Sequence, residues 1–281
     1  MRRYLYCYNT IVSFSEPIGN HEFLIRCLPV LGEYMSVEEE HLVLPPDYWK
    51  HHGTDTFNNR IVYGGNREPH SALAYVSTGI ISMHPYKINN DSLPLSIWLQ
   101  PTHLTTIISS FSFPPSLLDG VILAEMSPME KAESIMHNVN SYLSYVPFST
   151  DVDTTAQEVV ESRQGVCQDF SHLMIAICRI QGIPARYACG FVEGTGETHA
   201  WVEVYDALQN CWVGFDPTHD IRIEYGYVKL AHGRDAADCP VSRGQYNGFT
   251  NQQTLIWNTT LKMQLLLIIL NLMISSLVLI S

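Results

Sequence analysis

Positive charge is scarce in this sequence. Its 281 residues include 16 Lys and Arg against 28 Asp and Glu, which gives a net charge of −12. Nucleic acids and anionic membrane surfaces are bound by clustered basic side chains, so the composition argues against both as partners. The acidic residues are scattered along the chain, and this pattern favours a role in solubility over a dedicated acidic surface.

Paired cysteine motifs are also missing. The seven cysteines are irregularly spaced, their number is odd, and no Cys-x-x-Cys pair occurs. A disulfide framework or a zinc site is therefore not predicted, and a reducing compartment is favoured. The N-terminal stretch is broken by Asn9, Thr10 and Ser13, whereas a signal peptide needs a continuous apolar run. These features predict a cytoplasmic protein.

One long apolar run stands near the C-terminus, over residues 265–280, interrupted by Asn271, Ser275 and Ser276. It falls short of the roughly 20 residues that span a bilayer. We therefore treat residues 261–281 as an apolar tail, either a final core element or an appended stretch. Membrane contact through this tail, which would make the protein membrane-tethered, is the less favoured alternative.

Strand signals dominate residues 1–90. Short segments rich in β-branched and aromatic residues are separated by turn residues at 17–19, 45–47, 58–59 and 64–66. The predicted strands cover 4–14, 22–28, 41–44, 59–63 and 71–81. This spacing predicts an antiparallel, β-sandwich-like N-terminal domain. His51, His52 and His70 lie in polar loop contexts and are interpreted as solvated side chains.

Helical patterns begin after a proline-rich connector and define residues 91–260 as a second, α+β domain. Ser127 and Glu130 form a capping box around Pro128, which starts a helix that ends near 142. A short helix follows over 155–163, and a third helix over 167–181 has an apolar face. Strands at 185–192, 198–205 and 211–215 then predict an antiparallel meander, with less defined strands at 225–232 and 254–260.

Cys167 is predicted to lie in the first turn of the helix over 167–181. Unpaired backbone N–H groups and the positive end of the helix dipole favour a thiolate at such a position. The same N–H groups can stabilise the oxyanion of a tetrahedral intermediate. An isolated cysteine of this kind is more often a small buried apolar residue, so Cys167 alone does not establish a catalytic site.

His199 and Asp216 change that interpretation. His199 lies on the polar-aromatic face of the predicted strand 198–205, and Asp216 ends the next strand. If the two strands pair, Asp216 approaches His199 and can orient its imidazole. On its own, the face that carries His199 would be plain surface. Asp169 is predicted to support the helix N-terminus, and His172 to be packed or solvated.

Four segments carry a family resemblance: residues 162–173 (SRQGVCQDFSHL), 181–187 (QGIPARY), 198–204 (THAWVEV) and 214–218 (GFDPT). They resemble the bacterial transglutaminase-like superfamily, and residues 233–235 and 244–246 look like its closing segment. The resemblance covers about residues 4 to 260. It implies a papain-like α+β core with a helix-borne Cys167 as nucleophile, His199 as base and acid, and Asp216 as orienting acid, without a metal or organic cofactor.

The expected reaction is amide acyl transfer through a thioester on a protein or peptide substrate. Hydrolysis, as in a cysteine peptidase or amidase, is favoured. Protein-glutamine transamidation, as in a transglutaminase, is the first alternative, and a non-catalytic peptide-binding scaffold is the second. The sequence defines neither the substrate nor the oligomeric state.

Overall fold

The computed structural model describes residues 1–89, 93–108, 111–121, 126–248 and 253–263. Its strands are Arg2–Ile25 (β1), Met35–Val43 (β2), Trp49–Thr54 (β3), Arg60–Asn66 (β4), His70–Met83 (β5), Ile88–Asn89 (β6), Ser144–Tyr145 (β7), Gln164–Gly165 (β8), Ala185–Val192 (β9), Gly194–Gly196 (β10), His199–Asp206 (β11), Cys211–Asp216 (β12), Ile221–Arg222 (β13), Tyr227–Gly233 (β14), Ser242–Asn247 (β15) and Gln253–Met263 (β16). Its α-helices are Pro115–Leu118 (α1), Pro128–Tyr142 (α2), Ala156–Ser162 (α3) and Cys167–Ile180 (α4), and 3₁₀ turns occupy Leu95–Leu99 and Ala236–Asp238.

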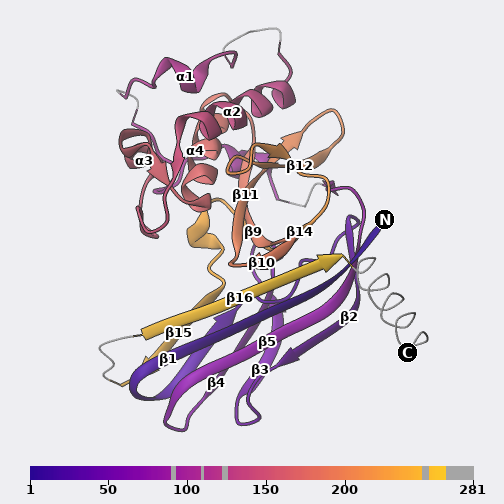
Figure 1. Cartoon of the computed structure of the whole chain (residues 1–281), viewed down its shortest axis with the longest axis vertical. Coiled ribbons are helices and arrows are strands. Elements are labelled where there is room, and N and C mark those ends of the chain that lie inside the picture. The colour runs from indigo at the N-terminus through magenta and orange to yellow at the C-terminus, as the bar shows by residue number, and fades with distance from the viewer. Residues whose placement is uncertain (90–92, 109–110, 122–125, 249–252, 264–281) are drawn as a thin grey trace, which may run out of the picture.

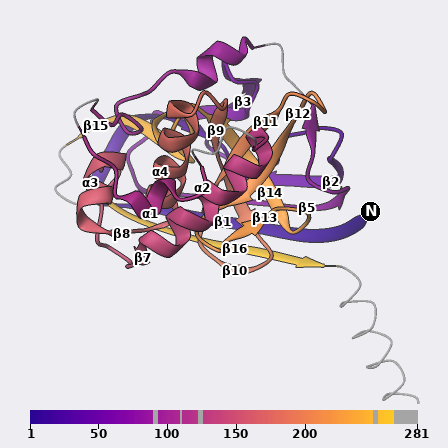
Figure 2. The same cartoon turned by 90° about the horizontal axis from the view of Figure 1, so that it is seen from above.

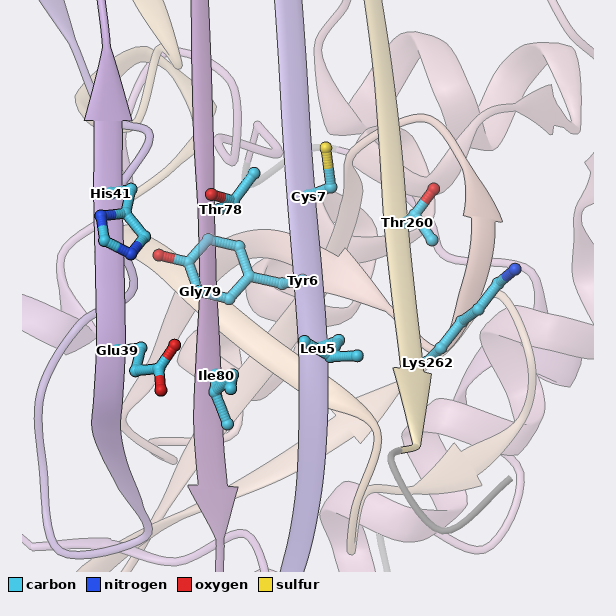
Figure 3. A pocket seen from close by; sticks show the side chains of 10 residues that line it. All are labelled: Leu5, Tyr6, Cys7, Glu39, His41, Thr78, Gly79, Ile80, Thr260 and Lys262. Carbon is cyan, nitrogen blue, oxygen red and sulfur yellow. The ribbon is translucent and has the colours of Figure 1, made fainter. Parts of the chain in front are cut away.

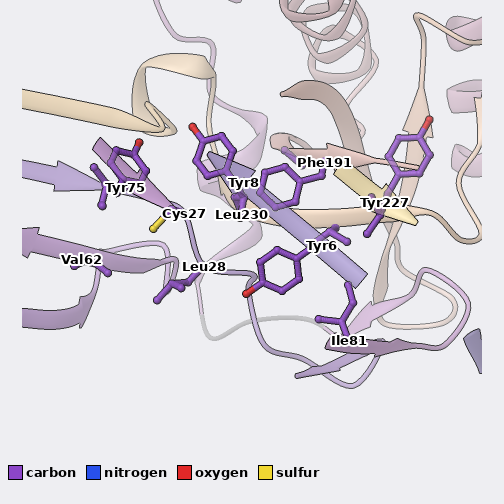
Figure 4. Close-up of a cluster of buried hydrophobic side chains, with 14 of the residues drawn as sticks. Tyr6, Tyr8, Cys27, Leu28, Val62, Tyr75, Ile81, Phe191, Tyr227 and Leu230 are labelled. Atoms are coloured by element: carbon purple, nitrogen blue, oxygen red, sulfur yellow. The ribbon is translucent and has the colours of Figure 1, made fainter. Parts of the chain in front are cut away.

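The long strands and the helices lie at opposite ends of the molecule (Figure 1). Strand β1 belongs to two curled antiparallel sheets, β10–β16–β1–β5–β2 and β15–β1–β4–β3. The inner faces of these sheets enclose an aromatic core, shown in part in Figure 4. Phe191 of β9 and Tyr227 of β14 enter the same core, with the Tyr8 and Phe191 ring centroids 5.2 Å apart. The β-rich part and the helical part therefore share packed side chains.

The second part is a sheet of order β13–β12–β11–β9–β14 with helices on one face. Viewed from above, α2 and α4 lie over the strands of this sheet (Figure 2). The apolar face of α4 includes Phe170, Leu173, Met174 and Ile177, which are buried against Val202, Val204 and Phe215 of the sheet. This arrangement confirms the predicted α+β class, with the cysteine-bearing helix on an antiparallel sheet.

Several predicted elements differ in detail. Residues 4–14 and 22–28 were predicted as separate strands, but β1 runs through Pro17 as one bent strand whose pairing register shifts near this position. A proline is tolerated at such a register break because no ladder hydrogen bond is required from it there. His51 and His52 lie on strand β3 and His70 begins β5, so the predicted loop context is wrong for these three residues, although β3 is exposed throughout.

The chain also returns to its starting sheet. Strand β15 and most of β16, which the sequence places in the second domain, pair with β1 along most of its length, while the last three residues of β16 belong to the predicted tail. The predicted division into 1–90, 91–260 and 261–281 does not follow this pairing, because the sheet around β1 draws strands from both ends of the chain. Residues 264–281, most of the predicted tail, lie outside the described residues.

No helix within the described parts of the chain combines the length and apolar character that crossing a bilayer requires. The cytoplasmic location stays a prediction.

Candidate active site

Cys167 is the first residue of α4, as the sequence predicts. It follows Gly165, the end of β8, and Val166, whose extended backbone (φ −112°) begins the helix. The Cys167 side chain is half-buried and is not in a disulfide. The sulfur thus belongs to the helix end whose first N–H groups have no acceptor within the helix.

Asp169 holds this turn in place. Its Oδ2 accepts hydrogen bonds from the Val166 backbone N–H (2.7 Å) and from the Thr150 hydroxyl (2.6 Å). The carboxyl is fully buried. Burial raises the pKa of Asp169, while these two hydrogen bonds oppose the rise. Asp169 therefore supports the helix N-terminus, which agrees with the role that the sequence indicates.

Gly165 provides a sharp test of this local packing. A Cβ added at Gly165 would lie 2.6 Å from the Asp169 Cβ and 2.8 Å from its Oδ2. Gly165→Ala is therefore expected to displace Asp169 and destabilise the fold by about 1–3 kcal/mol, measured by urea unfolding. Gly196→Ala is the control, because its added Cβ meets no atom within 4 Å. Equal, small effects of both substitutions would show that the Asp169 turn is not tightly packed.

His199 and Asp216 meet through the pairing of β11 and β12. Val202 lies opposite Phe215, so Trp201 falls opposite Asp216 and His199 is the diagonal neighbour of Asp216 on the same face. The His199 Nε2 lies 2.7 Å from the Asp216 Oδ2, with side chains 10% and 0% exposed. The meander expected from the sequence brings these two side chains into hydrogen-bond contact.

Asp216 accepts more hydrogen bonds than the sequence reveals. The Oδ2 atom also accepts from the Tyr227 hydroxyl (2.6 Å) and the His219 Nδ1 (2.7 Å), while Oδ1 accepts from the backbone N–H groups of Thr218 and His219. Burial opposes ionisation of this carboxyl, but its hydrogen bonds with His199 and His219 dominate and hold the pKa well below its usual range. Asp216 is therefore a carboxylate.

Sequence reasoning missed His219 and Tyr227. The spacing of Asp216 and His219, three residues apart across a turn, is a usable local signal for the first. Tyr227 has no such signal, because β14 reaches the site by pairing with β9 rather than with β12. The His219 ring also lies against the His199 ring, with centroids 4.9 Å apart.

The His199 imidazole is held as a cation. Burial lowers its pKa, but hydrogen bonds with Asp216 and with Cys167 outweigh this effect and raise the pKa from 6.5 to about 10. The Nε2 atom is bound to Asp216. Of the three residues predicted as the site, His199 and Asp216 are in direct contact, and Cys167 lies near enough to His199 to raise its pKa.

The raised pKa of His199 predicts how the stability of the protein changes with pH. A group whose pKa rises on folding stabilises the protein fully below its unfolded pKa, here about 6.5, and loses that contribution as the pH rises through its folded pKa. The unmodified protein should therefore be more stable than His199→Gln, as judged by the free energy of unfolding. This difference should be largest below about pH 6.5 and shrink toward pH 10. Chemical unfolding at several pH values measures it. A difference that grows with pH would contradict the assigned cation.

His172 takes no part in the contacts between His199 and Asp216. It is fully buried on α4, and its Nε2 accepts a hydrogen bond from the Ala236 N–H at 3.1 Å. Burial lowers the pKa of His172 to about 3. It is a neutral, packed side chain, one of the two roles that the sequence indicates.

Within the described residues, His199, Asp216 and His219 form the one group of His, Cys, Asp or Glu side chains whose ligand atoms all lie within 4.8 Å of one another. Two imidazoles and a carboxylate are a donor set that suits a transition metal. The His199 and His219 rings are each joined to Asp216 by a hydrogen bond of 2.7 Å. A metal at this place would have to displace the protons of both hydrogen bonds. The three side chains are joined by hydrogen bonds, and Asp216 accepts a further one from Tyr227.

A shallow hollow of about 380 Å³ lies elsewhere, on the outer face of β2, β5, β1 and β16 (Figure 3). Its lining combines apolar side chains, Leu5 and Ile80, with Thr78, Thr260 and Lys262. The hollow belongs to the sheet at the opposite end of the molecule from α4 (Figure 1). It does not include Cys167, His199 or Asp216.

Comparison with known proteins agrees with the fold and the motifs. Residues 115–217 match the family model of the transglutaminase-like superfamily. This part of the chain is therefore similar to a transglutaminase-like core, and the matched region includes Cys167, His199 and Asp216.

Two mycobacterial proteins and one bacterial crystal structure illustrate the similarity. The chain is 29% identical over 219 residues to the uncharacterised protein Rv2569c of Mycobacterium tuberculosis, covering 68% of this chain and 70% of that protein. It is 33% identical over 160 residues to the uncharacterised protein ML0607 of Mycobacterium leprae, covering 53% and 55%. The crystal structure of a candidate cysteine protease from Cytophaga hutchinsonii has a TM-score of 0.72 at 23% identity, covering 91% of this chain and 90% of that one, which shows a shared fold.

Proposed function

We propose that the protein catalyses thiol-dependent amide acyl transfer, with Cys167 as nucleophile, His199 as acid and base, and Asp216 as orienting acid. The observation that supports this most is the 2.7 Å hydrogen bond between His199 and Asp216, together with the raised pKa of His199, to which both Asp216 and Cys167 contribute. A cationic imidazole beside a sulfur favours the thiolate, the nucleophilic form of cysteine.

The proposed reaction has two steps. In the first, the Cys167 thiolate attacks the amide carbonyl carbon, the carbon–nitrogen bond breaks, and the His199 imidazolium gives its proton to the departing amine. The oxyanion formed on the way is stabilised by the unpaired N–H groups that begin α4. In the second, neutral His199 takes a proton from the incoming nucleophile, which attacks the thioester carbonyl carbon. The carbon–sulfur bond breaks, and the Cys167 thiolate and the His199 imidazolium are restored.

Water is the proposed second nucleophile, which makes the protein a cysteine peptidase or amidase. Cys167 is only half-buried, so water reaches the thioester unless a bound substrate excludes it. In transamidation an amine must compete with bulk water for the thioester. This reaction therefore needs a site that shields the thioester from water. The half-open site supports hydrolysis over transamidation.

Mass spectrometry of a glutamine-containing peptide, incubated with and without a primary amine, distinguishes these outcomes. We expect cleavage at a peptide bond or conversion of Gln to Glu as the main product even when the amine is present. Predominant incorporation of the amine would instead identify a transglutaminase. Absence of both products, across a panel of amides and isopeptides, would favour the non-catalytic peptide-binding scaffold.

A further inference from the structure

Three large apolar side chains are exposed on one short segment that hydrogen-bonds to the residues around Cys167. Tyr145, Phe148 and Val152 are 54%, 100% and 73% exposed and lie within eight residues of one another. Single exposed apolar residues are ordinary, but a group of them marks a binding surface. We call residues 145–152 the apolar rim.

The apolar rim is fastened to the helix that carries Cys167. The Val146 N–H donates to the Gly165 carbonyl (3.0 Å), and Thr150 donates to Asp169 (2.6 Å). The Gln168 side-chain amide lies 3.5 Å from the Val152 carbonyl. These contacts fix the rim against residues 165–169, on both sides of Cys167. Figure 2 shows β7 and β8, which lead into the rim and into α4, side by side.

Phe148 has a backbone conformation that points to a function. Its φ of 62° lies in the left-handed region, which costs a residue with a Cβ about 1–2 kcal/mol. A fully exposed phenylalanine gains no burial in return. Strained residues of this kind cluster at ligand-binding and catalytic sites, where the strain serves recognition.

Tyr145 connects the rim to the reacting centre. Partial burial raises the pKa of Tyr145, and the charges of Cys167, Glu197 and Asp169 raise it further. Tyr145 pairs with Gly165, two residues before Cys167, and its ring centroid lies 6.3 Å from that of Phe170 on α4. A side chain that contacts Tyr145 therefore lies near the bond that Cys167 would attack.

We infer that the apolar rim binds an apolar side chain that flanks the reacting amide of a peptide substrate, with Phe148 and Val152 as specificity-determining residues. An apolar group gains free energy by covering these exposed side chains. The exposed Glu197 carboxylate disfavours an acidic residue at the same position. This inference rests on the proposed function for the substrate's role, although the recognition itself can be measured without turnover.

Binding to Cys167→Ala tests the inference. Three capped heptapeptides that share a central Gln carry Leu, Ser or Asp on both sides of it, and their affinities are measured by calorimetry. We expect the Leu peptide to bind about 10-fold more tightly than the Ser peptide and the Asp peptide to bind most weakly, in line with 1–3 kcal/mol for an apolar contact. Adding Phe148→Asn, which suits a left-handed backbone, together with Val152→Ser, should reduce the Leu-to-Ser ratio to about 2-fold or less.

Leu208→Ser is the matched control, because Leu208 is 92% exposed in the turn between β11 and β12. It should leave the ratio unchanged. Equal affinities of the Leu and Ser peptides, or a ratio that survives both rim substitutions, would overturn the inference. A clear Leu preference in Cys167→Ala without turnover of any peptide by the unmodified protein would instead contradict the proposed function and leave the recognition site standing.

Discussion

Cys167→Ala is expected to lower kcat for amide acyl transfer by about 10⁴-fold or more, because removal of a covalent nucleophile eliminates the thioester route. The fold should be retained, since the Cys167 side chain is only half-buried and the helix begins through Val166 and Asp169 rather than through the sulfur. Product formation from a glutamine peptide measures the activity, and circular dichroism checks the fold.

Cys7→Ala is the matched control for this substitution. Cys7 is also a half-buried free thiol, but it lies on β1, in the sheet remote from α4. Its replacement should leave kcat within about 2-fold, a change well below 1 kcal/mol in activation free energy. Cys167→Ala protein with near-normal activity would remove Cys167 from the reaction.

Glu203→Gln is expected to destabilise the protein by about 3–5 kcal/mol, the largest stability effect that the structure predicts. The Glu203 carboxylate is fully buried, with Arg186 Nε at 2.5 Å and Lys229 Nζ at 2.9 Å. The Tyr86 hydroxyl also donates to it at 2.5 Å. Although burial opposes ionisation, these two cations hold the pKa of Glu203 well below its usual range.

The amide in Glu203→Gln would remove the negative charge that Arg186 and Lys229 contact. Urea unfolding measures the loss. Glu40→Gln serves as comparison, because Glu40 pairs with Arg60 at a more accessible place, where both side chains are about one-fifth exposed, and a screened pair contributes less. A Glu203→Gln protein as stable as Glu40→Gln would mean that the buried cluster does not depend on its negative charge.

Local sequence patterns predict the helical part of the fold well. The capping box at Ser127 and Glu130 marks the start of α2, and both reciprocal hydrogen bonds form. Strand β9 covers residues 185–192, as predicted. These elements have their own start and stop signals, such as a cap or Gly182 and Pro184 between α4 and β9, so a short window of sequence suffices.

Pairing between distant segments could not be predicted in this way. Nothing local in β16 indicates that Thr259 pairs with Tyr8, some 250 residues earlier in the chain. The course of β1 through Pro17 depends in the same way on the partners that hold both halves. Which distant strands pair is determined mainly by the free energy gained when side chains from separate segments become buried together.

The candidate site shows the same difference between residues with a local sequence signal and residues placed by distant strand pairing. Cys167, His199 and Asp216 could be selected because each follows a recognisable local signal, a helix start or a strand with a polar face. Tyr227 could not, since its hydroxyl reaches Asp216 only after β14 has paired with β9. The sequence therefore predicts which groups could react, while the tertiary structure determines which groups hold Asp216.

The rate of Cys167 alkylation tests the central claim, the coupling of the sulfur to His199 and Asp216, most directly. Iodoacetamide is added at about pH 6, where an ordinary thiol is almost wholly protonated and reacts slowly, and modification of Cys167 is followed by peptide mass spectrometry. We predict that Cys167 reacts at least about 10-fold faster in the unmodified protein than in His199→Ala, whose missing imidazolium no longer favours the thiolate. Equal rates in the two proteins, both at the level of an ordinary thiol, would contradict the account.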